Sequence, residues 1–396
     1  MNRKLLTMEV DYNSLARDGC DRKCVERFVE RCAAVGVRQM IWSVGFAGTA
    51  EYPSKILPRY TGAERDQSSM RAAETMSQYD PLAAAVELTR KCGIKLLAYF
   101  RMFDDYWPGM VDTFVDSLPE GWWSSRCGRF HLKGWPCYWL DEVKKHKLGI
   151  IREIAEYGVD GFVMGATRSH SLYVCPYTQP HFFGYNEPVA KEFFRRYGLD
   201  IRKFDYCVDL WIKDADSGAS FVNGTKYVGA VEFDHVQWNW LKGESVAQFI
   251  REVRNELGCD GHIALEASIY ACPPMADPKD PMPAKLYLNP IAMASERIIN
   301  EWVIPGNFRD MDFENLILSN FQRFRDTGAS FNVWLNDIFS PTGGEVSKWV
   351  TCEEVEKYIE RFINSSLVAM TLHEAAFLLR HPDSERIWAI LGHYFG

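Results

Sequence analysis

The sequence predicts an α/β protein that folds as a (β/α)8 TIM barrel with long loops after its strands. Short apolar runs of strand length alternate with amphipathic segments of helical spacing, an order typical of parallel βα units. The longest polar insertions follow the apolar runs, and a barrel carries its variable loops at the carboxyl ends of its strands. No Gly-rich phosphate loop follows the first run, which disfavours an open dinucleotide-binding sheet.

Eight apolar runs are the candidate strands. The first ends near Asp11, which places this carboxylate at the carboxyl end of a strand. The others are expected at residues 37–46, 94–101, 159–167, 262–270, 302–305, 329–339 and 370–378.

The segments between these runs repeat apolar residues at helical spacing. Asp80 and Pro81 begin one helix with a capping aspartate and a proline in the first turn, while Gly36 ends another. Gly243 is a point at which the longest helix is expected to break. The expected helices span residues 21–36, 80–93, 140–158, 187–198, 231–258, 313–328 and 351–365.

Residues 121–139 form the most unusual stretch of the chain. They contain four tryptophans together with Arg126, Arg129 and His131, and they are rich in Gly and Ser, so we expect a long loop. Aromatic rings offer flat apolar surfaces, arginines bind anions, and an imidazole moves protons near neutral pH. The simpler alternative is a surface loop that covers the end of the core. For the cluster as a whole, a binding site is favoured.

The overall composition is that of an ordinary globular protein, with 47% hydrophobic and 25% charged residues. One barrel can use most of 396 residues, so we expect a single catalytic domain over 1–396. A net charge of −8 argues against nucleic-acid binding, and no apolar run is long enough to cross a membrane. A monomer and a homodimer are equally compatible with the sequence.

The sequence predicts a cytoplasmic protein that binds no metal and no cofactor. Glu9 and Asp11 interrupt the apolar part of a signal peptide, so secretion would require that a leader had been removed. Eleven scattered cysteines without a recurring Cys-x-x-Cys pair predict reduced thiols. No His-Glu-x-x-His spacing and no Gly-x-Ser-x-Gly motif is present.

Polar and aromatic residues at the expected strand ends can face one cavity. Sugar cleavage needs one group that protonates the leaving oxygen and another that activates water or attacks carbon. Any single acid here has a structural alternative as a helix cap, and the arginines either pair with nearby aspartates or bind a substrate anion. The candidates are Asp11, Trp42, Arg101, Asp104, Asp105, Arg168, His170, Glu266, Asn336 and Asp337, with Arg126, Arg129 and His131 overhanging them.

Three segments, at residues 93–101, 151–162 and 184–198, resemble the glycoside-hydrolase-like barrels. In that superfamily the strand after Val-Asp-Gly often ends in an acid followed by an arginine. Here the strand reads Val163-Met-Gly-Ala-Thr-Arg168, so the arginine is present and the acid is absent.

Within that superfamily, an aspartate on the first strand and a histidine in the long third loop are similar to the inverting exo-sialidases of glycoside hydrolase family 156. The resemblance implies release of terminal sialic acid, with Asp11 and His131 as the acid–base pair. It also implies a β-rich C-terminal region, so the end of the domain over 1–396 is expected to be either truncated or followed by that region. A histidine suits such a substrate, because a second carboxylate would be repelled by that of the sugar. The resemblance implies substrate binding by Arg126, Arg129, Arg168 and Asn336. Trp42 and Arg101 are added as expected binding residues because they lie at predicted strand ends.

Two other hypotheses remain open. A neutral-sugar glycosidase would use Glu266 with Asp104 or Asp337 as its two carboxylates. A catalytically inactive barrel would bind carbohydrate without cleaving it. The expected partner is in each case a sialylated glycan or another carbohydrate.

Overall fold

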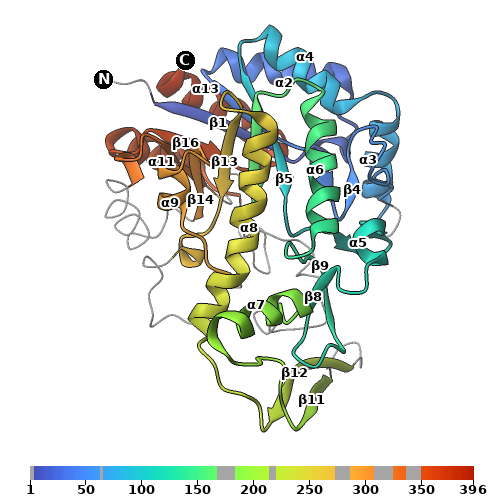
Figure 1. Cartoon of the computed structure of the whole chain (residues 1–396). Helices are drawn as coiled ribbons and strands as arrows, with labels where there is room; N and C mark the ends of the chain where they lie inside the picture. Colours follow the sequence, from blue (N-terminus) through green and yellow to red (C-terminus); the bar gives the residue numbers. More distant parts are fainter. Residues whose placement is uncertain are drawn as a thin grey trace.

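The computed structural model describes residues 4–62, 66–166, 183–213, 220–272, 286–306, 324–335 and 349–396. Eight parallel strands within these ranges close into a barrel in the order β1-β16-β15-β14-β13-β10-β5-β2 (Figure 1). β1 pairs with β2 on one side and with β16 on the other, which closes the ring. The predicted (β/α)8 barrel is confirmed.

Each predicted strand is present, most with narrower bounds than expected. The last predicted run divides, because β16 ends at Leu372 and a short helix, α12 (Ala375–Arg380), follows it. The barrel strands are β1 (Leu5–Val10), β2 (Gln39–Ser43), β5 (Lys95–Arg101), β10 (Gly161–Gly165), β13 (His262–Glu266), β14 (Glu301–Gly306), β15 (Ser330–Leu335) and β16 (Ala369–Leu372).

Helices surround the barrel, and none in the described ranges is both long and apolar enough to cross a membrane. Asp80 caps α4 as predicted, accepting hydrogen bonds from the backbone N–H groups of Leu82 and Ala83. The predicted helix over 313–328 lies mostly outside the described residues. The main helices are α1 (Tyr12–Ala16), α2 (Arg22–Ala34), α4 (Pro81–Lys91), α6 (Asp141–Ala155), α7 (Glu187–Tyr197), α8 (His235–Leu257), α9 (Pro290–Ser295), α11 (Cys352–Asn364) and α13 (Ser384–Phe395).

The expected break at Gly243 is wrong, since α8 continues through it. A Cβ atom at Gly243 would lie 1.7 Å from the backbone oxygen of Tyr287. The glycine is therefore explained by close packing of a neighbouring segment and not by a helix end.

The barrel interior has layers of different chemistry. Toward the amino ends of the strands, Glu301 accepts a hydrogen bond from Asn332 Nδ2 at 2.6 Å and lies 2.9 Å from His262 Nε2. Toward the carboxyl ends, Asp11 and Glu266 are the acids of two strand ends. An apolar layer lies between, formed by Ile41, Leu97, Tyr99, Val163, Ala264, Val303 and Trp334. Charged groups that could meet a ligand therefore gather at the carboxyl end, as expected for this fold.

Residues 121–139 are not the predicted long loop. They contain two antiparallel strands, β8 (Trp122–Ser124) and β9 (His131–Pro136). Trp123 and Trp135 are buried against Phe103, whose ring stacks on that of Trp135 at 4.5 Å. Burial of these rings outweighs the polar composition that suggested a loop.

Other insertions also contain structure that the sequence pattern did not indicate. The polar stretch after β2 includes the helix α3 (Gln67–Ser77). The segment between α7 and α8 includes an antiparallel hairpin, β11 (Tyr206–Lys213) and β12 (Ser220–Val228). β8, β9, β11, β12 and α7 gather at one end of the molecule, below the barrel in the view of Figure 1.

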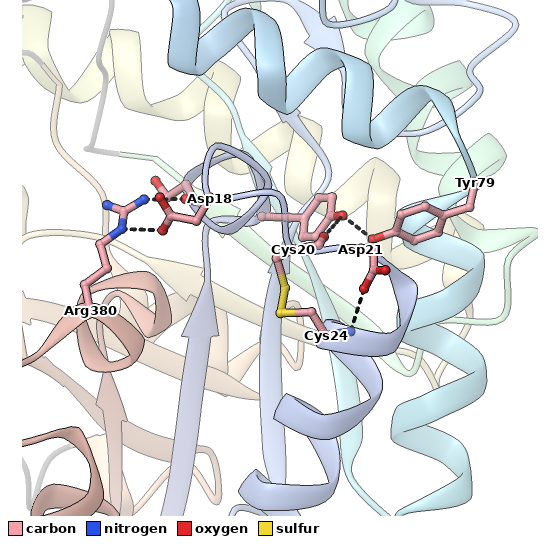
Figure 2. Close-up of a disulfide and its surroundings, with 8 residues drawn as sticks. Asp18, Cys20, Asp21, Cys24, Tyr79 and Arg380 are labelled. Carbon is pink, nitrogen blue, oxygen red and sulfur yellow. Dashed lines mark hydrogen bonds and ion pairs between the residues drawn. A yellow bond between two sulfur atoms is a disulfide. The ribbon is translucent and has the colours of Figure 1, made fainter.

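The prediction of uniformly reduced thiols is wrong for one pair, because Cys20 and Cys24 form a disulfide (Figure 2). It lies at the junction of α1 and α2. The Tyr12 hydroxyl donates to the Cys20 carbonyl at 2.9 Å, and Asp21 caps α2 by accepting from the Cys24 N–H at 2.9 Å. A separation of four residues brings the two sulfur atoms together because the chain turns into the first turn of the helix here.

Candidate functional site

Asp11 and Arg101 form an ion pair inside the carboxyl end of the barrel. Asp11 directly follows β1 and Arg101 is the last residue of β5, and Arg101 Nη2 lies 3.2 Å from Asp11 Oδ2. Arg101 Nη1 donates to Ser43 Oγ at 2.9 Å and to the Gly45 carbonyl at 2.8 Å. Asp104 is 3.9 Å from Arg101 Nε. Asp11 and Asp104, two of the acids that the sequence analysis offered as partners of this arginine, therefore pair with it.

A second carboxylate, Glu51, joins Asp11 through one amide. Asn13 Nδ2 donates to Asp11 Oδ1 at 2.9 Å and to Glu51 Oε1 at 2.8 Å. Burial, and next the negative charge of Asp11, raise the pKa of Glu51 to about 7 despite the opposing effect of Arg101. The sequence analysis missed Glu51, because an acid in a polar insertion carries no signal that it returns to the barrel.

Glu266 belongs to the same inner layer. It is the last residue of β13, fully buried, and its register partner on β10 is Gly165, which is also the register partner of Arg101 on β5. A Cβ atom at Gly165 would lie 2.8 Å from Tyr99 Cε2, so the glycine makes room for the Tyr99 ring. The alternative acid of the sequence analysis therefore lies two strands away from Arg101, and the strand between them carries Gly165 at this level.

His373 is a further ionisable group that the sequence analysis missed. It directly follows β16, its Nε2 lies 3.6 Å from Glu9 Oε2, and its ring lies 5.4 Å from that of Trp334. Its position just beyond a strand end was a usable signal, but the predicted last strand continued past it.

Arg126 joins the β8–β9 hairpin to the segment between α7 and α8. Its Nη2 donates to the carbonyl oxygens of Lys203 and Val231 at 3.0 and 2.8 Å. The guanidinium carbon lies 5.6 to 5.9 Å from the centres of three rings, those of Tyr185, Tyr227 and Phe233. Buried hydrogen bonds and cation–π contacts of this kind fix the segment between α7 and α8 onto the β8–β9 hairpin.

Arg129 and His131 also lie in that hairpin. Arg129 Nη2 is 2.9 Å from Asp209 Oδ1 on β11, and half of the arginine side chain is exposed. His131 begins β9 opposite Ser124 and is half-buried. No hydrogen bond or ion pair joins His131 to Asp11 or Arg101 in the part of the chain that the structure describes.

One expected substrate-binding residue, Trp42, does not reach the inner layer. Trp42 lies outside the strand ring, where its ring stacks on Tyr12 at 5.1 Å, because its neighbour Ile41 takes the inward position. Arg168 and Asn336 lie outside the described residues, as do His170 and Asp337.

A buried network next to the layer is structural. Lys147 Nζ lies 2.6 Å from Asp105 Oδ2 and 2.9 Å from Asp112 Oδ2, and His146 Nε2 is 2.8 Å from Asp112. Burial raises the pKa of Asp105 to about 7 although Lys147 opposes the shift. The adjoining cavity, lined in part by Arg101 and Asp105, has a volume of about 30 Å³.

Comparison with known proteins gives similarity of fold at low sequence identity. No protein-family model matches the chain, and no curated protein matches it in sequence. The PgaB (BpsB) glycoside hydrolase domain from Bordetella bronchiseptica is similar in structure, with a TM-score of 0.59, 12% identity, and coverage of 98% of this chain and 99% of that one.

Two further solved structures share the architecture. The catalytic domain of β-amylase from Paenibacillus polymyxa matches with a TM-score of 0.51 and 12% identity, covering 100% of this chain and 98% of that one. β-N-acetylhexosaminidase from Bacteroides fragilis matches with a TM-score of 0.54 and 10% identity, covering 99% and 66%. The chain therefore has the (β/α)8 fold that these glycoside hydrolases share.

Proposed function

We propose that this protein is a glycoside hydrolase whose acid and base are carboxyl groups at the carboxyl end of the barrel. The observation that carries the proposal is the pair formed by Asp11 and Glu51 around Asn13. Asp11 has a guanidinium partner, while the pKa of Glu51 is raised to about 7. Sugar hydrolysis uses two carboxyl groups held in different environments, one protonated and one ionised.

In this scheme Glu51 donates a proton to the leaving oxygen, and Asp11 activates water or attacks the anomeric carbon. Arg101 holds Asp11 in place and balances its charge. Glu266 is the alternative acid, since it ends a strand in the same layer. The glycoside hydrolases that share the fold support the reaction class by analogy alone.

The charges favour a neutral glycoside as substrate. In the described part of the layer, Asp11, Asp104 and Glu51 surround Arg101, and Glu266 ends a strand two positions away in the ring. An excess of acids repels an anionic sugar more than a neutral one. The exo-sialidase remains the second candidate, carried by the sequence resemblance, with Asp11 and His131 as its acid–base pair and Arg168 and Asn336 as binding residues.

Hydrolysis of neutral aryl glycosides beside an aryl sialoside, at about pH 5 to 7, distinguishes the candidates. We expect turnover of a neutral substrate, a loss of about 100-fold or more in Glu51→Gln and Asp11→Asn, and little change in His131→Ala. Turnover of the sialoside alone, lost in His131→Ala and giving inverted product by NMR, would select the sialidase. Sugar binding without turnover across the panel would select the inactive carbohydrate-binding barrel.

The disulfide bears on where the protein acts. Structural disulfides persist in oxidising compartments and are rare in the cytoplasm. We therefore propose an oxidising compartment in place of the cytoplasmic location expected from the sequence, on the strength of the Cys20–Cys24 bond. Mass mapping of the protein isolated under thiol-blocking conditions tests this, because a cytoplasmic protein would carry both thiols in the alkylated form.

A further inference from the structure

We propose that Cys127 and Cys207 are a redox-reactive thiol pair, which a peroxide oxidises to a disulfide that links the β8–β9 hairpin to the β11–β12 hairpin. The inference is independent of the glycosidase proposal. Both cysteines are free thiols in the structure, and both are half-buried. Neither belongs to the inner layer of the barrel.

The two thiols share one guanidinium. Cys127 lies in the connection between β8 and β9, and Cys207 is the second residue of β11. Arg129 Nη2 donates to Cys207 Sγ at 3.0 Å and binds Asp209 Oδ1 at 2.9 Å, while Ser125 Oγ lies 3.5 Å from Cys127 Sγ. Arg129 lowers the pKa of both thiols and Cys127 acts on that of Cys207, so the two side chains lie near one another around this guanidinium.

The surroundings assign the two thiols different roles. Partial burial opposes ionisation of Cys127, but hydrogen bonds with Ser125, Arg129 and Tyr227 outweigh it and lower the pKa of this thiol to about 7. Burial and then the neighbouring Cys127 raise the pKa of Cys207, with Arg129 opposing. Because the thiolate is the nucleophile, Cys127 is the attacking group and Cys207 is the resolving thiol.

Three other thiols in the described part of the chain lack this environment. Cys32, Cys137 and Cys272 are buried, and burial raises the pKa of each. Cys259 is exposed, so it tests whether exposure alone suffices for reaction. A low pKa and access to solvent coincide at Cys127, as they do in redox-sensing cysteines.

The chemistry balances with hydrogen peroxide as the oxidant. The Cys127 thiolate attacks one peroxide oxygen, the O–O bond breaks, and the products are a Cys127 sulfenic acid and hydroxide, which takes up a proton to become water. The Cys207 sulfur then attacks the sulfenic sulfur, and the departing hydroxide takes up the proton of Cys207 as a second water. Two thiols are oxidised to one disulfide and one peroxide is reduced to two waters.

The test treats the reduced full chain with hydrogen peroxide, blocks the remaining thiols, and maps the peptides by non-reducing mass spectrometry. We expect a peptide pair linked through Cys127 and Cys207. In Cys207→Ser the sulfenic acid of Cys127 persists and is captured by dimedone, whereas Cys127→Ser leaves Cys207 reduced. Cys259→Ser, the matched control, behaves as the wild type. The proposal would be overturned if Cys127 and Cys207 both remained open to alkylation after excess peroxide. A disulfide from Cys127 to any other cysteine would also overturn it.

A second readout follows the thiolate without requiring a disulfide. The rate of Cys127 alkylation by iodoacetamide is expected to rise with a midpoint near pH 7 in the wild type. The titratable and charged groups around it are Arg129, Asp209, Tyr227 and Cys207. In Arg129→Gln the midpoint moves to higher pH, while Arg129→Lys retains part of the shift. An unchanged midpoint in Arg129→Gln would contradict the role given to the arginine.

Discussion

At the scale of the residue, Arg101 decides whether the acids around it can remain buried. Its guanidinium is the ion-pair partner of Asp11 and Asp104, and the Asp11–Arg101 pair is almost entirely shielded from water. Removing one member of a buried ion pair leaves the other charge without compensation, which is more costly than the pair itself is favourable. Stability at this point is therefore coupled to the proposed chemistry.

We expect Arg101→Ala to lower the free energy of unfolding by about 3 to 5 kcal/mol in urea titrations. Arg22→Ala is the matched control, because Arg22 pairs with Glu87 with both side chains half-exposed. Such an exposed pair contributes little to stability, because water screens its charges. Equal losses in the two variants would show that the buried pair has no special role.

Glu51→Gln gives a pH-dependent prediction. The folded-state pKa, about 7, lies above the ordinary value of 4.5, so the folded protein holds a proton that the unfolded chain releases between these values. This contribution to stability is complete below about pH 4.5 and is lost as the pH rises through about 7. Glutamine retains the acceptor for Asn13 without the charge. Between pH 5 and pH 8, urea unfolding should therefore show the variant gaining about 2.5 kcal/mol relative to the wild type. A constant difference would contradict the assignment.

The sequence predicts some of these residues and not others for a physical reason. Asp11, Arg101 and Glu266 end strands, and strand ends can be located from local apolar patterns. Glu51 reaches the layer only because its insertion folds back onto Asn13, which no local pattern encodes. The arginines of residues 121–139 were expected to bind an anion, but in the structure Arg126 and Arg129 bind carbonyl groups and an aspartate of the chain itself.

At the scale of the element, α8 shows tertiary packing overriding helix propensity. Replacing glycine by alanine inside a helix normally stabilises it by about 0.5 to 1 kcal/mol. At Gly243 the new methyl group would overlap the Tyr287 carbonyl, so we expect Gly243→Ala to destabilise by about 2 kcal/mol or more.

Gly149, in the middle of α6, provides the control. A Cβ atom there meets only the end of Ile56 at 3.4 Å, so Gly149→Ala should be neutral or stabilising. Thermal unfolding of both variants measures the contrast. A gain in stability for Gly243→Ala would mean that the Tyr287 segment moves aside at little cost.

Elements were predictable where a helix or strand has a regular apolar pattern and is flanked by capping or helix-ending residues. α4 begins at Asp80 and α2 ends before Gly36, as the capping residues indicate. β8 and β9 were missed because their apolar residues are tryptophans among glycines and charges, and composition averaged over the stretch concealed the pairing. Their stability comes from Phe103, a contact made by another part of the chain.

At the scale of the whole molecule, the helix α13 near the end of the described chain packs against α2 near its beginning. Trp388 on α13 packs edge-on against Phe28 of α2 at 6.1 Å and lies beneath the Arg31 guanidinium at 4.8 Å. We expect Trp388→Ala to cost about 3 to 5 kcal/mol in urea unfolding. Trp211→Ala on β11, where the side chain is 60% exposed, should change stability by about 0.5 kcal/mol or less. A comparable loss in both variants would contradict a global role for α13.

The fold class was the most predictable property, because the βα alternation recurs along the chain and no single misplaced boundary changes it. The split of the last predicted strand into β16 and α12 leaves the barrel intact. The barrel mouth was the least predictable, because the insertions that surround it pack on one another through contacts such as those of Arg126.

The seam between β1 and β16 also sets the order of events during synthesis. Leu5 pairs with Ala369, so the ring cannot close until β16 has been made. Before β16 arrives, the seven earlier strands can form only an open sheet with β1 and β15 as bare edges. Contacts this distant in sequence form slowly, and bare edges attract strands of other chains. Refolding yield should therefore fall with protein concentration, and we expect shielding of the nascent chain to matter until β16 has emerged.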